Sequence, residues 1–295
     1  MSGTAPAPRG GSRTVPVAAV LGSVLSLQFG AAFASTLFDD VGALGTVTLR
    51  LTLAAVILWA VVRPSVRHWR PAQWRGVVAL GASLAAMNGF FYVYVAIARL
   101  PLAAAVTIEF LGPLALAAVL SRRPRDALWV ALALAGVVLL GARGLGGDGG
   151  ALDPAGVGFA LLAAAGWAWY IVAGSHVATT VSGAAGLTVA TTVAAALVLP
   201  LGLGTAGAGL ADPAILAAGA AVALLSSVVP YSLEMRALRE LPKNVFAILI
   251  ALEPAAAALA GALVLGQWVQ PVAAVGIALV IVAGVGALRG SGDPR

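Results

Sequence analysis

The sequence predicts an all-α, polytopic membrane protein with ten transmembrane helices arranged as two inverted five-helix repeats. Three observations lead to this fold class: the composition, the placement of basic residues, and an internal repeat of acid and proline. Of the 295 residues, 61% are hydrophobic and 9% are charged, whereas a soluble domain has about 25% charged residues. Apolar segments of the ~20 residues needed to cross a hydrocarbon core of about 30 Å recur along the chain.

Charged, Pro-rich and Gly-rich clusters separate the apolar segments. Reading between these clusters predicts helices at 15–35, 41–62, 74–98, 101–120, 126–142, 153–174, 184–203, 212–235, 242–265 and 270–288. The corresponding domains are a cytoplasmic tail at 1–14, a first repeat at 15–142, a second repeat at 153–288 and a cytoplasmic tail at 289–295. No connection is long enough to hold a folded domain.

Basic residues fall almost entirely on one side of the predicted membrane. That side holds Arg9, Arg13, Arg63, Arg67, Arg70, Arg75, Arg122, Arg123, Arg125, Arg236, Arg239, Lys243, Arg289 and Arg295. The other side holds Arg99 and Arg143. Because cytoplasmic loops carry the excess of Lys and Arg, both termini are predicted to be cytoplasmic, in a cell or inner membrane.

Several function classes find no support in the residues. The chain has no cysteine, and its two histidines, His68 and His176, fall near the predicted cytoplasmic surface. No Ser/His/Asp or metal-ligating group is expected at one depth, so neither an enzyme, a metal site nor a cofactor is predicted. The net charge of +6 comes from short loops and does not predict nucleic-acid binding. The segment Gly144–Gly150 lacks the Lys-Ser/Thr of a phosphate loop.

An internal repeat links the fourth and ninth predicted spans. Pro101 is followed twelve residues later by Pro113, and Pro242 is followed twelve residues later by Pro254. Glu109 precedes the second proline of the first pattern, and Glu253 precedes that of the second. Five helices per half force the second half to be inverted, as in many secondary transporters whose sites lie near the bilayer midplane. Chance spacing in low-complexity sequence is the alternative.

Three ionisable residues are predicted close to the bilayer centre. Counting 1.5 Å per residue places Arg50, Glu109 and Glu253 about 12 to 15 Å from the nearer membrane surface. Charges at this depth cost roughly 2.5–3.5 kcal/mol each and persist where they pair or face a watery cavity. One glutamate is expected to neutralise Arg50, while desolvation favours the neutral form of the other. A structural ion pair that only locks the helices is the alternative.

Other candidate residues accompany these charges. Pro113, Pro254 and Pro230 are predicted helix breaks, because a proline removes a helical hydrogen bond and clashes with the carbonyl four residues earlier. The polar candidates are Asn88, Tyr92, Trp167, Tyr170 and Glu234, with Gln28 as a further cavity-lining candidate. Each of them could instead be a buried side chain bonded to a neighbouring helix, and Glu234 could pair with Arg236 or Arg239 near the cytoplasmic end.

Two blocks of the sequence resemble a known family. "MNGFFYVYVAIARLPLAAAVTIEFLGPLALAAVLSRR" and "PYSLEMRALRELPKNVFAILIALEPAAAALAGALVLGQ" are similar to the EamA-type branch of the drug/metabolite transporter superfamily, and within it to the threonine/homoserine exporter subgroup. The resemblance spans residues 15–288. It implies ten helices in two inverted halves, a central cavity, and efflux of small amino acids or related metabolites driven by the proton gradient. Gln267 stands where many members of the family carry an acid, directly after the glycine that closes the ninth predicted span.

The sequence therefore predicts a proton antiporter that exports small amino acids, with Arg50 holding a carboxylate and Glu109 or Glu253 binding an ammonium or a proton in turn. The expected partners are this small-molecule substrate, protons and membrane lipid. A homodimer remains open, since small-xxx-small patterns occur on nearly every helix. The alternatives are an uptake permease for a different metabolite, an intramembrane enzyme, and a non-transporting membrane subunit.

Overall fold

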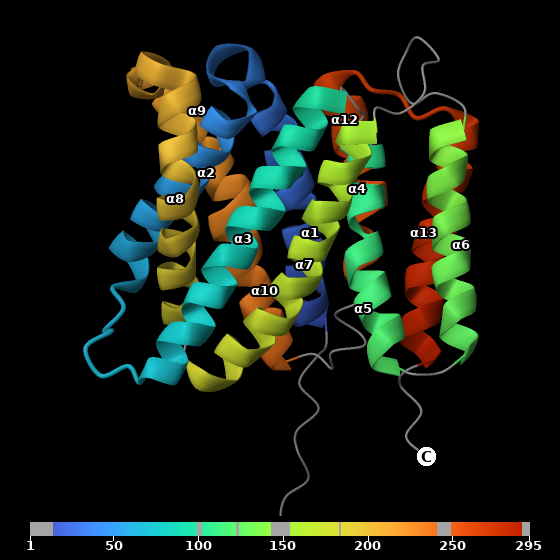
Figure 1. Ribbon diagram of the computed structural model, residues 1–295, viewed down its shortest axis with the longest axis horizontal. Helices are drawn as coiled ribbons and strands as arrows, with labels where there is room; N and C mark the ends of the chain where they lie inside the picture. Colours follow the sequence, from blue (N-terminus) through green and yellow to red (C-terminus); the bar gives the residue numbers. More distant parts are fainter. Residues whose placement is uncertain are drawn as a thin grey trace, which may run out of the picture.

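The computed structural model describes residues 14–98, 102–121, 124–142, 154–182, 184–240 and 249–290, and within these ranges the chain is almost entirely helical, with no strand. The helices of the first half are α1 (Thr14–Ser35), α2 (Phe38–Val62), α3 (Pro71–Ala98), α4 (Leu102–Glu109), α5 (Leu111–Ser121) and α6 (Pro124–Ala142). Those of the second half are α7 (Pro154–Thr180), α8 (Ala185–Ala206), η1 (Gly207–Ala211), α9 (Pro213–Ala223), η2 (Leu224–Val228), α10 (Val229–Glu240), α12 (Glu253–Leu265) and α13 (Pro271–Gly290). Figure 1 shows these helices side by side, roughly along one common axis.

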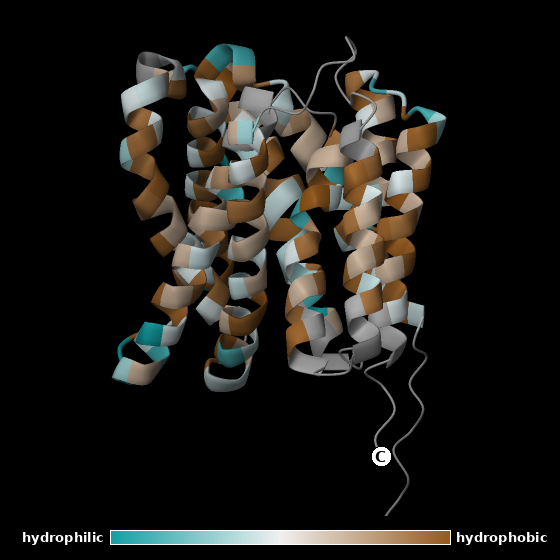
Figure 2. Ribbon diagram, turned by 45° about the vertical axis from the view of Figure 1, so that its right-hand side comes forward, coloured by the Kyte–Doolittle hydropathy of each residue, from teal (hydrophilic) through white to brown (hydrophobic). Residues whose placement is uncertain are grey.

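The all-helical membrane prediction is confirmed by this architecture. Five of the described helical segments are long and apolar enough to cross a membrane: Thr14–Ser35, Phe38–Val62, Pro154–Thr180, Ala185–Ala206 and Pro213–Glu234. Shorter apolar helices accompany them, among them Leu102–Leu116 and Pro271–Gly286. Hydrophobic residues dominate the length of the bundle, whereas hydrophilic residues gather at its two ends and in a few patches at mid-height (Figure 2). Such a surface suits a hydrocarbon solvent.

The helices pack in pairs that combine the two halves of the chain. α3 packs along α7, α2 along α8, α6 along α13, and α4 along α12. α1 packs against both α10 and α12, and α7 packs against both α3 and α5. The interior of the bundle therefore lies between residues from both halves, and each of its central helices has partners from the other half.

The predicted fourth, eighth and ninth spans are each interrupted. α4 ends at Glu109 and α5 begins at Leu111, so that Pro113 lies in the first turn of α5. The eighth span changes from α-helix to the π-helix η2 just before Pro230. In the ninth span a turn at residues 251–252 precedes α12, which has Pro254 in its first turn. Proline is tolerated in a first helical turn because the N–H there has no partner within the helix.

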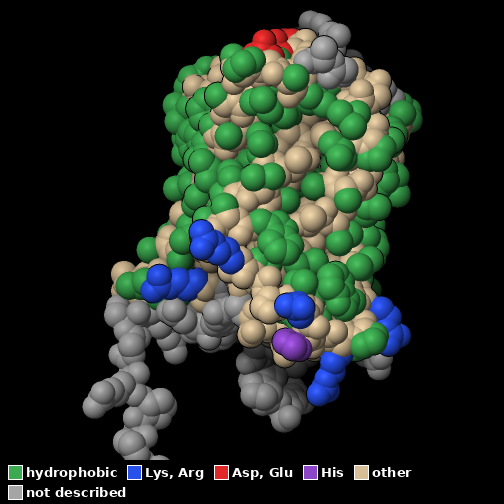
Figure 3. Space-filling model, turned by 90° about the vertical axis from the view of Figure 1, so that its left-hand side faces the viewer, with side chains coloured by type: hydrophobic (Ala, Val, Ile, Leu, Met, Phe, Trp, Pro, Cys, Tyr) green, Lys and Arg blue, Asp and Glu red, His purple; other side chains and the backbone are tan. Residues whose placement is uncertain are grey.

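Charged side chains separate to opposite ends of the molecule. The exposed residues Asp39 and Asp40 lie in the first turn of α2. Exposed basic residues surround the connection from α2 to α3: Arg63, Arg67, Arg70 and Arg75. In Figure 3 the acidic and basic side chains lie at opposite ends of a largely hydrophobic face. α1 begins, and α13 ends, at the lower end of the bundle in Figure 1.

Candidate functional site

Arg50 lies at the centre of a buried polar group between the two halves. Its side chain is 3% exposed. Nε donates a hydrogen bond to Ser227 Oγ at 2.9 Å, Nη1 donates to Tyr92 Oη at 3.0 Å, and Nη2 donates to the carbonyl oxygen of Ser226. The guanidinium carbon also lies 5.6 Å from the centre of the Tyr92 ring. α2, α3 and η2 together hold this one cation.

Pro230 explains why a backbone carbonyl is available to Arg50. Proline has no N–H, so in α-helical register it leaves the carbonyl of Ser226 without its helical donor. In the π-helical register of η2 the carbonyl of Leu225 would lose its donor instead. Both oxygens find donors on other helices, since Ser26 Oγ of α1 donates to Leu225 O at 2.6 Å and Arg50 donates to Ser226 O. The proline and the π-turn thus create acceptors inside the bundle.

Among the described residues, Arg50 has no direct ion pair with a glutamate. The hydrogen bonds of its guanidinium go to neutral acceptors on Ser226, Ser227 and Tyr92. Glu109, the buried last residue of α4, interacts electrostatically with Arg50 without a hydrogen bond between them. The acceptors beside Pro230 and on α3, which spacing along the sequence does not reveal, bond to the guanidinium, and Glu109 is the carboxyl that lies in its electrostatic field.

Glu253 and Glu234 lie against α1. Gln28 Nε2 donates to Glu253 Oε2 at 3.4 Å, and Ser23 Oγ donates to Glu234 Oε1 at 2.7 Å. Both carboxyls are buried, at 3% and 7% exposure, and each lies within electrostatic range of the other. Glu234 therefore does not reach the surface toward Arg236. The packing of α10 on α1 keeps its carboxyl inside.

Aromatic side chains surround the charged groups. The rings of Tyr170 and Tyr231 contact each other with centroids 6.0 Å apart. Trp167 packs edge-to-face on Phe110, with centroids 5.9 Å apart, beside the end of α4. Trp167 and Tyr170 both face the interior, whereas Trp169 between them is 45% exposed, as expected for residues three apart on a helix.

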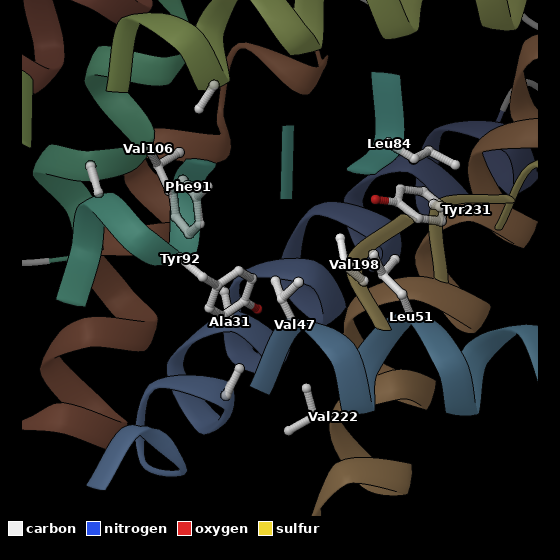
Figure 4. Packing of buried hydrophobic residues seen from close by; sticks show 14 of the residues in the cluster. Ala31, Val47, Leu51, Leu84, Phe91, Tyr92, Val106, Val198, Val222 and Tyr231 are labelled. Atoms are coloured by element: carbon white, nitrogen blue, oxygen red, sulfur yellow. The ribbon is translucent and has the colours of Figure 1, made fainter. Parts of the chain in front are cut away.

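Some buried polar atoms have no hydrogen-bond partner, and Gln28 and Tyr231 among them belong to this group. Among the described residues the buried side-chain atoms without a hydrogen bond are Gln28 Oε1, Thr52 Oγ1 and Tyr231 Oη. Asn88 lies next to Tyr231 but gives its amide hydrogen to Leu84 O of its own helix at 2.8 Å. Figure 4 shows the hydroxyls of Tyr92 and Tyr231 pointing toward the middle of the view from opposite sides. Buried polar atoms are normally bonded, so these mark a place for a ligand or for water.

Comparison with known proteins reveals the class to which this arrangement belongs. The EamA-like transporter family matches residues 154–288. The threonine/homoserine exporter RhtA of Escherichia coli K12 is 39% identical over 272 residues, which cover 92% of this chain and 90% of that protein. RhtA of Salmonella typhimurium LT2 is 40% identical over the same shares of both chains. This chain belongs to the EamA-like transporter family.

As an EamA transporter, the protein is a multi-pass membrane protein that moves a solute and is not an enzyme. A crystal structure of another protein shares its fold with a TM-score of 0.62 at 22% identity, covering 92% of this chain and 96% of that one. The described residues contain no cluster of three or more His, Asp or Glu side chains that could hold a metal ion.

The structure of this EamA transporter brings together most of the residues that the sequence singled out. Arg50, Tyr92, Glu109, Glu234 and Glu253 are buried in the interior, with Asn88 and Tyr170 beside Tyr231. Sequence reasoning missed a set of hydroxyl residues, namely Ser23, Ser26, Ser226, Ser227 and Tyr231. A signal for three of them was present, because Ser226, Ser227 and Tyr231 flank Pro230 in "SSVVPY".

Proposed function

We propose that the protein is a proton-coupled antiporter that exports small amino acids such as threonine and homoserine. The observation that carries the proposal is the buried group of one guanidinium and three carboxyls, assembled from both halves of a chain that belongs to a transporter family. Charged groups are costly inside a membrane and mark pathways for substrates and ions. The relatives named threonine/homoserine exporters supply the substrate class.

Arg50 is the residue for the substrate carboxylate. A guanidinium has five N–H donors, and three of those of Arg50 are engaged by Ser226, Ser227 and Tyr92. The remaining donors suit a carboxylate, which accepts paired hydrogen bonds from arginine. Glu109 or Glu253 then binds either the substrate ammonium or a proton, and exclusive binding of the two gives antiport by competition.

The inverted repeat of 15–142 and 153–288 is part of the proposal, and the packing supports it. In this repeat α1 is equivalent to α7, and α10 is equivalent to α3. The pair α1–α10 is therefore equivalent to the pair α7–α3, and both pairs are in contact. A Cβ on Gly30 of α1 would lie 2.7 Å from the backbone nitrogen of Ser226, and one on Gly166 of α7 would lie 2.8 Å from that of Met87 in α3. Two equivalent helix pairs thus cross closely at a glycine.

The proposed orientation places both termini and the α2–α3 connection in the cytoplasm. The exposed basic residues of that connection and the exposed Asp39 and Asp40 at the opposite end support it, because basic loops remain on the cytoplasmic side. Ten spans in the inner membrane follow from the same alternation. In this orientation Glu234 lies on the cytoplasmic side of the site, and Asp39 marks the external end.

Flux through purified protein tests the proposed function. The protein is reconstituted into liposomes with an imposed pH gradient, and the counterflow and net efflux of labelled threonine, homoserine and other amino acids are measured. We expect saturable counterflow of homoserine or threonine, and net efflux that the gradient accelerates. Liposomes prepared without protein are the control. A wild-type protein that moves no amino acid under any gradient would exclude the proposal.

A further inference from the structure

Glu234 and Glu253 form a polar group with α1 that is distinct from the surroundings of Arg50. The two carboxyls repel each other electrostatically, and Tyr170 lies within electrostatic range of both. They accept hydrogen bonds from Ser23 and Gln28, both on α1. Neither carboxyl forms an ion pair with a basic side chain among the described residues, whereas Glu109 lies in the field of Arg50.

A buried acceptor without a donor lies inside this group. The Gln28 side chain is 3% exposed, and its Nε2 bonds to Glu253 while its Oε1 has no partner. The ring of Tyr231 contacts that of Tyr170 beside this group. The group therefore offers two carboxyls and an amide oxygen as acceptors, and it contains no basic side chain among the described residues.

These acceptors indicate which chemical group would fit between them. A primary ammonium has three N–H donors and one positive charge, so it can bond to a carboxylate and to the amide oxygen together. The faces of Tyr170 and Tyr231 attract a cation as well. A metal ion is a weaker fit, since the described residues hold no group of three or more ligating side chains.

We propose that Glu253, Glu234 and Gln28 form the site for the primary ammonium of the substrate, and that Glu109 remains the counter-charge of Arg50. This inference rests on the proposed function and assigns its two carboxyl roles to different residues. The two charged ends of an amino acid are then recognised separately, the carboxylate by Arg50 of α2 and the ammonium by side chains of α1, α10 and α12. Compounds that lack either end should bind weakly.

Competition by matched analogues tests the assignment. Counterflow of labelled homoserine is inhibited with unlabelled homoserine, with 4-hydroxybutyrate, which lacks the amine, and with 3-aminopropan-1-ol, which lacks the carboxylate. We expect the wild-type protein to bind 4-hydroxybutyrate about 10- to 100-fold more weakly than homoserine, as hydrogen bonds to charged groups predict. In Glu253→Gln the inhibition constant for homoserine should rise by about the same factor, while that for 4-hydroxybutyrate stays unchanged.

Glu109→Gln is the matched control, because it removes an equally buried carboxyl from the other half. It should keep the wild-type preference for homoserine over 4-hydroxybutyrate. If Glu109→Gln loses this preference and Glu253→Gln keeps it, the inference is overturned and the ammonium site moves to α4. A wild-type protein that transports homoserine but binds the amine-free analogue equally well also overturns it. A wild-type protein that transports no amino acid defeats the proposed function instead.

Gln28→Met provides a second variant that leaves every charge in place. It removes the unpartnered oxygen, together with the Nε2 donor to Glu253, at nearly constant volume, and the preference for homoserine should fall about 3- to 10-fold, as expected for the loss of one hydrogen bond to the substrate. Monodisperse elution and an unchanged melting temperature show that each variant is folded. If Glu253→Gln is not folded, the preference of Gln28→Met for homoserine over 4-hydroxybutyrate tests the inference in its place. A wild-type preference in Gln28→Met would then overturn the inference.

Discussion

Glu109 and Glu253 occupy matching helix breaks in the two halves, yet their surroundings differ in charge. Glu109 is the last residue of α4 before its break, and Glu253 is the first residue of α12 after its break. Glu109 lies in the field of Arg50, whereas Glu253 lies beside Glu234 and accepts from Gln28. The acid-proline element thus sets the position of each carboxyl, and the helices packed around it set what the carboxyl can bind.

Removal of Arg50 should have the largest effect, because it abolishes the charge that distinguishes the two surroundings. Arg50→Met leaves Ser226 O, Ser227 Oγ and Tyr92 Oη without their donor, and each buried unsatisfied group costs about 1–3 kcal/mol. We expect homoserine flux to fall about 100-fold or more and the melting temperature to drop. Proteoliposome flux and thermal unfolding in detergent measure the two effects.

Arg50→Lys is the control for charge alone. An ammonium cannot reproduce the forked geometry of a guanidinium, so its flux should lie between that of the wild type and that of Arg50→Met. Wild-type flux in Arg50→Met would contradict the role of Arg50 in binding.

Replacing either glutamate by glutamine tests most directly whether the two carboxyls have different roles. A glutamine cannot take up and release a proton, so in both Glu109→Gln and Glu253→Gln the pH gradient should no longer accelerate homoserine efflux. Counterflow without a gradient should persist in Glu109→Gln and weaken about 10- to 100-fold in Glu253→Gln. Efflux from proteoliposomes with and without the gradient gives both quantities. If one variant keeps full acceleration, coupling resides in the other half alone.

Restoring the N–H of residue 230 should have an intermediate effect. In Pro230→Ala the new donor competes with Arg50 for Ser226 O and favours an α-helical register over η2. We expect homoserine flux to fall about tenfold, with no loss of thermal stability, since proline inside a helix costs up to ~3 kcal/mol. Pro200→Ala, at an exposed position inside α8, should leave flux unchanged. Equal flux in both variants would show that the bond from Arg50 to Ser226 O is dispensable.

The glycine crossings predict the smallest effects and test whether the halves are equivalent. Gly30→Ala and Gly166→Ala each place a methyl group less than 3 Å from the backbone of a neighbouring helix. Each should lower stability by about 1–3 kcal/mol, as measured by thermal unfolding. Gly158→Ala on α7, where a Cβ meets nothing within 4 Å, is the control and should stabilise slightly. A large loss of stability at only one of the two crossings would show that the two helix pairs are not equivalent.

Hydropathy and spacing were sufficient for much of the architecture. The predicted spans 15–35 and 41–62 differ from α1 and α2 by no more than a few residues, because each is bounded by charged or Pro-rich sequence. α7 runs to Thr180, beyond the predicted end at 174. This extension packs along α3, and the hydroxyls of Thr179 and Thr180 are satisfied by carbonyls of their own helix, including that of His176.

The candidate site was predictable in its charges and less so in its partners. An arginine or glutamate inside an apolar span is conspicuous, so Arg50, Glu109 and Glu253 could be selected from the sequence. A serine is not, because it is compatible with a membrane helix and bonds equally well to its own backbone, as Ser226 Oγ does to Val222 O. Ser23 and Ser26 acquire their roles only from the packing of α1 against α10 and η2.

The π-turn before Pro230 leaves the eighth span with two carbonyls that are bonded by other helices. The carbonyls of Leu225 and Ser226 are held by Ser26 and Arg50 rather than by the helix itself. If the substrate carboxylate drew the guanidinium away from Ser226, one of these two bonds would be lost at the joint between α9 and α10, and α10 carries Tyr231 and Glu234. We therefore expect binding at Arg50 to change the angle between α9 and α10.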